Sequence, residues 1–486
     1  MNSFIKNKPL IITPVFILFC LIGNVFSQTK FFEKNYGGIR DDYGFAVKEL
    51  SDGNYMISGW TKSYNTGNPN KPDVYLLKTK PNGDSIWFKN FGTTESEYGF
   101  SMDLTKDGGY IIGGHLYDFF SEYLIMKIKP NGTLDWTKSY KGKFPLWDNY
   151  LTSVKQTTDN GYILAGYSNA FDTTNFDIWL IKTDSTGDTL WTKTFGGIYN
   201  EEAWSIIQTT DGGYAILGTT FSYGKNSGNY SDIYLIKTNN HGDSLWTKHY
   251  GGDYNEFGND IMQTQDNGFV VAGSNNSMGK GMSDLWLIRT DSMGDTIWTK
   301  TYGGTSEDQG RFVKSYKGGY LIGGISYSES YGNSDGYVVI TTSNGSFVKS
   351  FHYGGAINDE FQSGLVTKND DILLIGNTSS KKVTNADILF VKLGQGTSIP
   401  NLPDSKNKVL VYPNPFEHEM NVYFNDNEIH KVRFILSDIN GKEIVNIEKT
   451  TANFLNVPLS NTQSGIYFYR IILGDGEQYW GKLIGR

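Results

Sequence analysis

The hydrophobic positions of this chain form short runs that recur about every fifty residues. In one unit, polar turns separate apolar runs at 203–210, 214–220, 232–238 and 244–250. The turns are rich in Asp-Gly and Asn-Gly, which favour hairpins because Gly, Asn and Asp tolerate a positive φ. Each unit is therefore predicted to form four antiparallel strands. No sustained helical period accompanies the repeat, which argues against a helical solenoid.

An aromatic-x-Lys-x-aromatic motif lies in the last strand of each unit and is usually followed by Gly-Gly. Its copies begin at Phe32, Trp87, Trp136, Trp191, Trp246, Trp298 and Phe347, so their spacings are 55, 49, 55, 55, 52 and 49 residues. This strand alternates between its two faces, whereas the second and third strands are continuously apolar, which indicates burial on both faces. Sheets of this kind fit between two neighbours, and seven of them around an axis make an all-β, seven-bladed β-propeller over 28–394.

The ends of the repeat region predict how the ring closes. The seventh unit ends after its third strand, at 387–393, and no motif strand follows it. One orphan copy of that strand, at 32–36, precedes the first unit. We predict that these two segments pair, because pairing would remove two exposed edges at once.

The unit resembles the propeller repeats found in secreted proteins of Bacteroidetes. Its Gly-Asp-[Ser/Thr]-[Ile/Leu]-Trp hairpins are also similar to quinoprotein-type and Asp-box repeats. The resemblance covers about residues 31 to 394 and implies the fold much more than an activity.

The first 27 residues have the pattern of a secretory signal peptide. Two lysines precede an apolar run from Leu10 to Ile22, and a cleavage site follows at Ser27. Pro14 and the short length of the run argue against a membrane-spanning helix. A lipoprotein signal would use Cys20, but the bulky Phe19 before it disfavours that cleavage. We therefore predict a signal peptide over 1–27 and no transmembrane segment in the mature chain.

Composition narrows the possible partners and chemistry. The net charge is -8 and the isoelectric point is near 5.4, which argues against nucleic acid and anionic membranes as partners. The one cysteine lies in the predicted signal peptide, so the mature protein is expected to lack disulfides and thiolate chemistry. No His-x-x-x-His pair, Gly-x-Ser-x-Gly elbow or phosphate-binding loop occurs. No metal, cofactor or catalytic residue is predicted.

A Gly-, Ser- and Pro-rich segment at 395–410 is predicted to be a linker to a separate domain at 411–486. Alternating apolar positions such as Val432, Phe434 and Leu436, with a turn at 440–441, predict a small Ig-like β-sandwich.

This tail resembles the type A C-terminal sorting domain of the type IX secretion system of Bacteroidetes. Four motifs carry the resemblance: Tyr412-Pro413-Asn414-Pro415, Asp438-Ile439-Asn440-Gly441-Lys442, Leu459-Ser460 with Ser464-Gly465-Ile466-Tyr467, and Gly481-Lys482-Leu483. The resemblance implies handling by the type IX secretion machinery, export across the outer membrane and removal of the domain. It also implies surface attachment or release. The alternative is an ordinary Ig-like adhesion module.

Acidic residues recur before the first strand of each unit. They are Asp41, Glu97, Asp148, Glu202, Glu256, Asp308 and Glu360. A ring of carboxylates could bind cations or position a sugar, but capping of the backbone in the loops between blades is the favoured interpretation. Glycosidase chemistry would need two carboxyl groups about 5 to 9.5 Å apart, and no motif here identifies such a pair.

One repeated position differs from unit to unit, as a single ligand site requires. It follows the Gly at the end of each second strand and is occupied by Trp60, His115, Tyr167, Thr219, Ser274, Ile325 and Asn377. The rings of the first three units could stack on the apolar faces of sugars. We predict ligand binding by Trp60, His115 and Tyr167, with Trp147 on a nearby loop.

The sequence thus predicts a secreted or cell-surface binding or adhesion propeller. Its candidate ligands are a polysaccharide or another surface protein. The alternatives are a secreted glycan-active enzyme, such as a glycosidase or lyase, and a structural spacer whose rim residues bind nothing.

Overall fold

The computed structural model describes residues 28–64, 68, 70–144, 147–171, 175–328, 330, 332–380, 385–395, 409–412, 419–424, 430–451, 454–459, 465–474 and 476–485. The predicted signal peptide and nearly all of the predicted linker lie outside these residues. One compact unit covers Gln28–Gln395, and a second lies within Gly396–Arg486. In the part of the chain so described, no helix has the length and apolar character of a membrane span.

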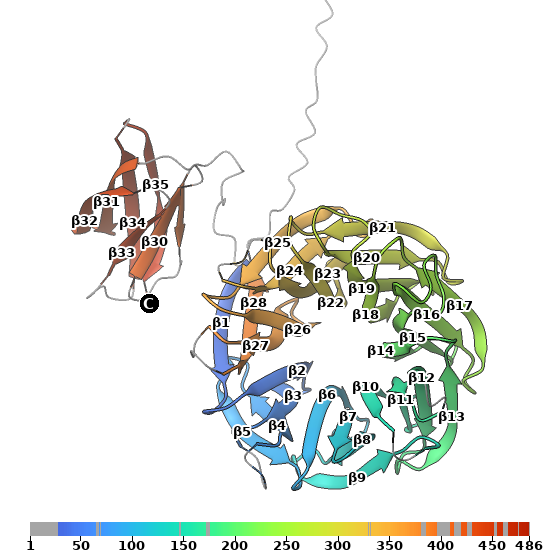
Figure 1. Cartoon of the computed structure of the whole chain (residues 1–486). Helices are drawn as coiled ribbons and strands as arrows, with labels where there is room; N and C mark the ends of the chain where they lie inside the picture. Colours follow the sequence, from blue (N-terminus) through green and yellow to red (C-terminus); the bar gives the residue numbers. More distant parts are fainter. Residues whose placement is uncertain are drawn as a thin grey trace, which may run out of the picture. The chain divides into compact units, whose positions relative to one another are not determined.

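The first unit is a ring of seven four-stranded antiparallel sheets (Figure 1). We call these sheets blades one to seven, in chain order from β2. Blade one holds β2 (Asp42–Glu49), β3 (Tyr55–Thr61), β4 (Asp73–Thr79) and β5 (Ser85–Phe91). Blade two holds β6 (Ser96–Leu104), β7 (Tyr110–Tyr117), β8 (Ser121–Ile128) and β9 (Leu134–Tyr140). Blade three holds β10 (Asn149–Gln156), β11 (Tyr162–Ser168), β12 (Asp177–Thr183) and β13 (Thr189–Phe195).

The remaining blades have the same order from the centre of the ring outwards. They are β14 (Glu201–Gln208), β15 (Tyr214–Thr220), β16 (Asp232–Thr238), β17 (Ser244–Tyr250); β18 (Glu256–Gln263), β19 (Phe269–Asn275), β20 (Asp284–Thr290), β21 (Thr296–Tyr302); β22 (Asp308–Tyr316), β23 (Gly319–Ser326), β24 (Asp335–Thr341), β25 (Phe347–Tyr353); β26 (Asp359–Val366), β27 (Ile372–Thr378), β28 (Asp387–Gln395), β1 (Gln28–Tyr36). The predicted all-β, seven-bladed propeller is confirmed.

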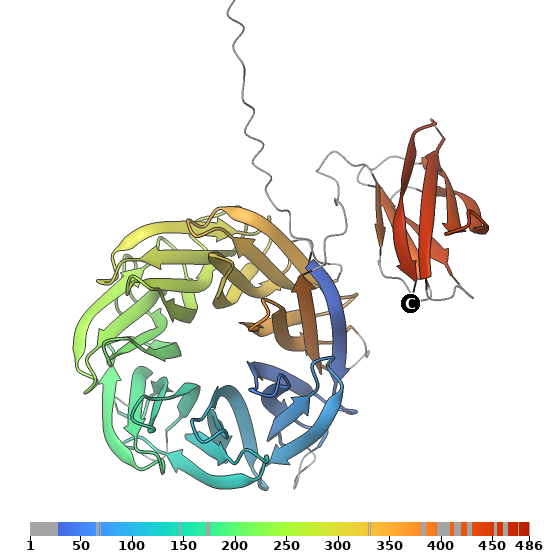
Figure 2. The ribbon, with the colours of Figure 1, turned by 180° about the vertical axis from the view of Figure 1, so that it is seen from behind.

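The ring closes as predicted, by pairing of the first and last strands of the unit. β1 runs antiparallel to β28, with Phe32 opposite Lys392 and Tyr36 opposite Ile388. The two strands lie side by side at the outer rim in both ribbon views (Figures 1 and 2). The Phe32 ring contacts the Phe390 ring at a centroid distance of 5.1 Å. The pairing leaves blade seven with four strands like the others.

Hydrophobic cores lie between neighbouring blades. Both faces of the middle strands are buried, as their continuous apolar runs predict. Leu180 of β12 and Ile216 of β15, for example, belong to one buried cluster. Ile57 of β3 and Ile375 of β27 join the first blade to the last in the same way. Each blade is therefore stabilised mainly by the apolar surface it buries against its two neighbours.

The aromatic-x-Lys-x-aromatic motif connects each outer strand to the following blade. Nζ of Lys193 lies 2.7 Å from a carboxylate oxygen of Asp243, and the hydroxyl of Tyr250 donates to the carbonyl of Gly294 at 2.7 Å. Gly242, at φ 78°, packs beneath the Trp191 ring, where a Cβ would come within 2.7 Å of ring carbon. The recurring residues thus hold the ring together.

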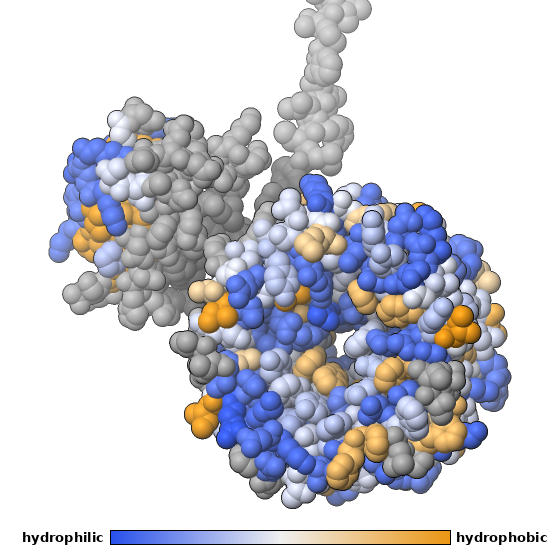
Figure 3. Space-filling model, viewed as in Figure 1, coloured by the Kyte–Doolittle hydropathy of each residue, from blue (hydrophilic) through white to orange (hydrophobic). Residues whose placement is uncertain are grey.

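A β-bulge in every innermost strand turns side chains towards the axis of the ring. In β2 the register shifts between Gly44 and Ala46, so that Phe45 is the extra residue. The equivalent shift occurs in β6, β10, β14, β18, β22 and β26. The innermost strands consequently line a central channel, and its hollow is visible in the space-filling view (Figure 3).

The C-terminal unit is a β-sandwich, as predicted. One sheet holds β29 (Val409–Tyr412), β30 (Glu419–Phe424) and β33 (Phe454–Pro458). The other holds β32 (Glu443–Thr451), β31 (His430–Asp438), β34 (Gly465–Leu473) and β35 (Gln478–Gly485). Phe434, Leu436, Leu455 and Ile471 are among the fully buried side chains of its core.

The tail motifs have structural roles where the structure describes them. Asp438 accepts hydrogen bonds from the backbone N–H groups of Asn440 and Lys442, each at 2.9 Å, and Gly441 adopts φ 81°. Gly465 begins β34, Tyr467 is buried and Lys482 is exposed. Tyr412 ends β29. Pro413, Asn414 and Pro415 lie outside the described residues.

Candidate functional site

The predicted binding residues are directly opposite aromatic residues of the innermost strands. Register pairs Trp60 with Tyr43, His115 with Tyr98, and Tyr167 with Tyr150. The ring centroids in these three pairs are 4.3, 4.9 and 5.2 Å apart. Such distances are those of favourable aromatic contacts. Each of the first three blades therefore presents two packed rings near the end of the channel that carries the long loops.

Further contacts join these pairs across the blade boundaries. Trp60 contacts Tyr98 edge-on at 5.5 Å, and His115 contacts Tyr150 edge-on at 5.1 Å. Tyr167 contacts Trp204 of blade four at 5.9 Å. Phe176 also contacts Tyr150 and Tyr167, at 6.0 and 5.4 Å. We call the other connected rings the aromatic arc; it comprises Tyr43, Trp60, Tyr98, His115, Tyr150 and Tyr167, with Phe45, Phe100 and Trp204 on its channel side.

The arc is confined to one side of the ring. All nine of its side chains are partly exposed. At the position equivalent to Trp60, the other four blades carry Thr219, Ser274, Ile325 and Asn377, which are 1%, 2%, 6% and 4% exposed. Pairs of partly exposed rings at this level thus occur in three consecutive blades, whereas blade five carries the single ring of Phe257, which is 38% exposed.

Trp147 does not join the arc. Its side chain is 36% exposed, and its carbonyl accepts a hydrogen bond from Nδ2 of Asn149 at 2.9 Å. Among the described residues, no ring contact links Trp147 to the arc. The structure therefore brings together three of the four predicted residues.

A carboxylate lies at each end of the arc. Glu360 of β26 accepts a hydrogen bond from Nδ2 of Asn377 at 2.9 Å, and its charge helps to raise the pKa of Tyr43 after the larger effect of burial. Glu202 of β14 occupies the same position in blade four, and burial raises its pKa. Its charge, after burial, raises the pKa of Tyr167.

Most of the blades have an acidic side chain that accepts hydrogen bonds from backbone N–H groups in the loop between blades, as favoured from the sequence. In several blades the capping residue is the neighbour of the one predicted. Gly197 N–H donates to Glu201 at 2.7 Å and Gly355 N–H donates to Asp359 at 2.7 Å. Glu97, Glu256 and Asp308 have the same role, as predicted, while Asp42 takes it in place of Asp41. The neighbours Glu202 and Glu360 instead occupy the register position that Tyr43, Tyr98 and Tyr150 hold in the first three blades.

Sequence reasoning missed the innermost-strand half of the arc. Tyr43, Tyr98 and Tyr150 differ from their counterparts Glu202, Phe257, Gln309 and Glu360 in the other blades. The signal was the repeated Tyr-Gly-Phe at 43–45 and 98–100, which directly follows the capping acid.

The ionisable rings of the arc are neutral at physiological pH. Burial lowers the pKa of His115 to about 4, and its Nδ1 is buried with no hydrogen-bond partner among the described residues. Burial raises the pKa values of Tyr98 and Tyr150. Phenol hydroxyls and a neutral imidazole both donate and accept hydrogen bonds, as recognition of hydroxyl groups requires.

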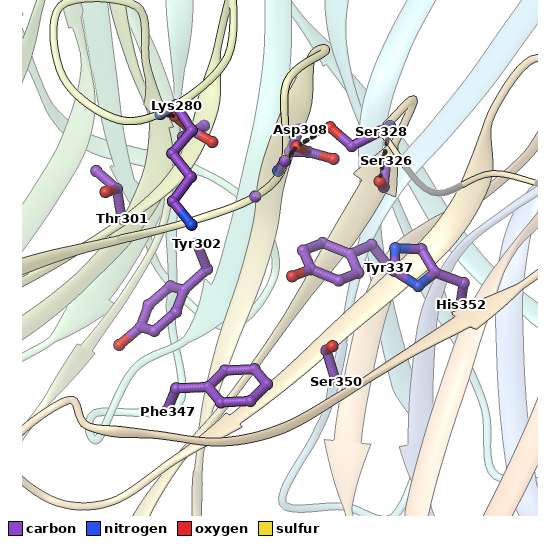
Figure 4. A pocket seen from close by; sticks show the side chains of 13 residues that line it. Lys280, Thr301, Tyr302, Asp308, Ser326, Ser328, Tyr337, Phe347, Ser350 and His352 are labelled. Carbon is purple, nitrogen blue, oxygen red and sulfur yellow. Dashed lines mark hydrogen bonds between the residues drawn. The ribbon is translucent and has the colours of Figure 1, made fainter. Parts of the chain in front are cut away.

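A second hollow of about 310 Å³ lies between blades five and six (Figure 4). Tyr337 stacks on His352 at 4.6 Å there, and Phe347 lies across from them. The carboxylates of this hollow are occupied: Asp284 accepts the N–H of Lys280 at 2.6 Å, and Asp308 accepts the hydroxyl of Ser328 at 2.6 Å. Both carboxylates thus cap loops here.

Clusters of three or more His, Cys, Asp or Glu side chains able to hold a metal ion do not occur in the described segments.

Comparisons with known proteins identify the tail. Residues 410–485 match the family of secretion system C-terminal sorting domains. The chain thus carries a sorting domain of the type IX secretion system and is exported across the outer membrane to the cell surface. A comparison with curated proteins gives no match.

Several solved structures are similar to the chain at low identity. A protein of unknown function from Bacteroides caccae is 11% identical over 55% of this chain and 86% of that one, with a TM-score of 0.34. Sqt1 from Chaetomium thermophilum is 10% identical over 76% and 100%, with a TM-score of 0.43. The β-propeller domain of the Trilobed protease from Pyrococcus furiosus is 11% identical over 75% and 97%, with a TM-score of 0.41. At these scores none of the similarities bears on what this chain binds.

Proposed function

We propose that the propeller is a binding module that the type IX secretion system delivers to the cell surface, and that it recognises a polysaccharide through the aromatic arc. The observation that carries the proposal is the confinement of partly exposed aromatic pairs to three adjacent blades. A scaffold role would repeat around the ring, as the Lys193–Asp243 contact does. The arc does not repeat.

The arc combines the two kinds of contact that sugars need. Faces of Trp and Tyr rings pack against the apolar C–H faces of a pyranose, while phenol hydroxyls at the ring edges exchange hydrogen bonds with sugar hydroxyls. Glu202 and Glu360 add acceptors at the two ends. Because the rings already pack on one another, binding would immobilise few side chains, which reduces the entropic cost of association.

A surface protein is the other class of partner, and a glycan-active enzyme is the alternative activity. A glycan array probed with the purified chain tests the proposal, together with release of reducing sugar from each bound glycan. Glycan binding without release supports the module. Binding with release assigns the propeller to the enzyme class. Absence of glycan binding, with capture of a surface protein that Trp60→Ala abolishes, would replace the glycan with a protein ligand.

A further inference from the structure

One cavity of the central channel is lined by more positively than negatively charged side chains. It has a volume of about 190 Å³ and lies below the channel side of the aromatic arc. Its walls include four cations, Lys48, Lys155, Arg311 and Lys314, but only one carboxylate, Asp260. This basic lining contrasts with the net charge of -8 on the whole chain. We call these four cations and the space between them the basic waist.

Two of the four cations are neutralised by neighbouring blades. Nζ of Lys48 lies 2.9 Å from Oδ1 of Asp103, a residue behind the cavity wall. Nζ of Lys314 lies 2.6 Å from Oδ2 of Asp260. Both carboxylates also accept backbone hydrogen bonds, from Gln156 and Val313 respectively, each at 3.1 Å. Their positions are therefore fixed by the blades and not by the lysines alone.

The other two cations have no hydrogen-bond or ion-pair partner among the described residues. Nε of Arg311 is buried without a partner. Lys155 makes no hydrogen bond or ion pair, although the charges of Lys48, Asp103, Asp260 and Lys314 all act on it. Lys155 of blade three lines the channel cavity together with Asp260 of blade five. Cations that are partly withdrawn from water without a directly paired carboxylate are costly, and a bound anion would reduce that cost.

Other polar groups of the waist are already occupied by backbone. Oγ1 of Thr152 donates to the carbonyl of Ala203 at 2.8 Å, and Nδ2 of Asn259 donates to the carbonyl of Gly310 at 2.7 Å. Their bonds leave Lys155 and Arg311 as the free cationic donors, beside the uncharged side chains of Gln362 and Ser363. Arg presents a planar fork suited to two oxygens of one anion, and Lys adds a point charge.

We infer that the basic waist binds one small oxyanion group, a carboxylate, sulfate or phosphate, between Lys155 and Arg311. The cavity is several times the roughly 30 Å³ that one water occupies in the liquid, so such a group fits. The group is either a free ion or the acidic substituent of a sugar that enters past Phe45, Phe100 and Trp204, which line both the cavity and the arc. The site does not depend on the ligand of the arc.

Isothermal titration calorimetry of the purified chain with inorganic phosphate, inorganic sulfate and glucuronate tests this inference. We expect saturable binding of at least one anion. Lys155→Met and Arg311→Met should each weaken it about tenfold or more, because each removes a charged hydrogen bond. Lys225→Met is the matched control, since Lys225 is an exposed lysine paired with the exposed Asp253, and it should leave the affinity unchanged.

The pH dependence of anion affinity distinguishes the contribution of Lys155 from that of Arg311. Burial, with a smaller effect from Lys48, lowers the pKa of Lys155 to about 8, while Asp103 and Asp260 oppose the shift. Wild-type affinity for sulfate or glucuronate, whose charges are constant in this range, should therefore fall as pH rises from 7 to 9, and the fall should persist in Arg311→Met but disappear in Lys155→Met. Arg311→Met keeps the test decisive if Lys155→Met does not fold.

The outcomes distinguish the sources of the anion and the failure of the site. Phosphate or sulfate binding without glucuronate binding assigns the site to a free ion, and glucuronate binding assigns it to an acidic sugar. Trp60→Ala should not change either affinity, so loss of glycan binding at the arc would leave this result intact. No saturable binding of any of the three anions, or equal affinities in wild type, Lys155→Met and Arg311→Met, would overturn the inference.

Discussion

The indole ring of Trp60 stacks on the phenol ring of Tyr43, with centroids 4.3 Å apart and planes inclined by 25°. The two residues are cross-strand partners in blade one. Tyr43 also lies beside Glu360 of blade seven, whose charge acts on its hydroxyl, and Trp60 contacts Tyr98 of blade two. This pair therefore links one carboxylate end of the aromatic arc to the rest of it across the boundary between blades seven and one.

Closure by β1 predicts that Phe32 matters for stability although it lies near the N-terminus. Phe32→Ala removes its packing against Phe390 and should lower the free energy of unfolding by about 2 kcal/mol, less than for a fully buried Phe because Phe32 is partly exposed. Chemical denaturation measures the change. Phe347→Ala is the matched control, since Phe347 has the same place in the motif of blade six but is 58% exposed. Equal effects of the two variants would contradict closure by β1.

The contacts between blades predict that a buried hydrogen bond contributes more to the free energy of unfolding than an exposed ion pair does. Tyr250→Phe deletes a buried hydrogen bond to the Gly294 carbonyl and should lower the free energy of unfolding by about 1 kcal/mol or more. Lys193→Ala breaks the exposed ion pair with Asp243 and should cost less, since water and salt screen such pairs. Denaturation at low and at high salt compares them. A larger effect for Lys193→Ala than for Tyr250→Phe would show that the ion pairs dominate.

Burial of His115 predicts acid-sensitive stability. Its folded pKa of about 4 is below the ordinary value of 6.5, so between these values the unfolded chain binds more protons than the folded one. The free energy of unfolding should therefore fall as pH drops from 6.5 to 4, by up to about 3 kcal/mol, and level off below pH 4. His115→Phe should remove this component, which the difference between the two denaturation curves isolates. Parallel curves for wild type and variant would show that His115 titrates normally.

The sorting domain predicts that its deletion changes where the chain is found in the cell. Deletion of 411–486 should leave the propeller folded in the periplasm, because residues 410–485 match the sorting-domain family. Cell fractionation followed by limited proteolysis measures both location and folding. Delivery of the truncated chain to the cell surface would show that another part of the chain directs export.

Much of the fold follows from the repeat because the same residues recur in comparable places. The orphan motif from Phe32 to Tyr36 has the sequence of the other outer strands, so its partner at β28 could be deduced without coordinates. The variable position that holds Trp60, His115 and Tyr167 was recognised in the same way. Once the repeat is aligned, a position that differs between units is visible.

The sequence did not predict the innermost-strand half of the aromatic arc or the cations of the channel. The first depends on the β-bulge, and the second depends on residues of different blades that meet at the axis of the ring. The bulge at Phe45 breaks the simple alternation of β2, so alternation could not tell which of Asp41, Asp42 and Tyr43 faces the channel. A shift of one residue reverses the face in a strand. Lys155 and Arg311 lie on different blades and share no motif, and only the closed ring brings them together.

The most direct test of the account compares binding of an array-identified glycan by wild type, Trp60→Ala and Phe347→Ala, by calorimetry, with circular dichroism as the check on folding. Trp60 belongs to the arc and Phe347 to the hollow between blades five and six. Binding at the aromatic arc predicts that Trp60→Ala raises the dissociation constant about tenfold or more while Phe347→Ala leaves it unchanged. Unchanged affinity in folded Trp60→Ala, or loss of binding in Phe347→Ala alone, would contradict it.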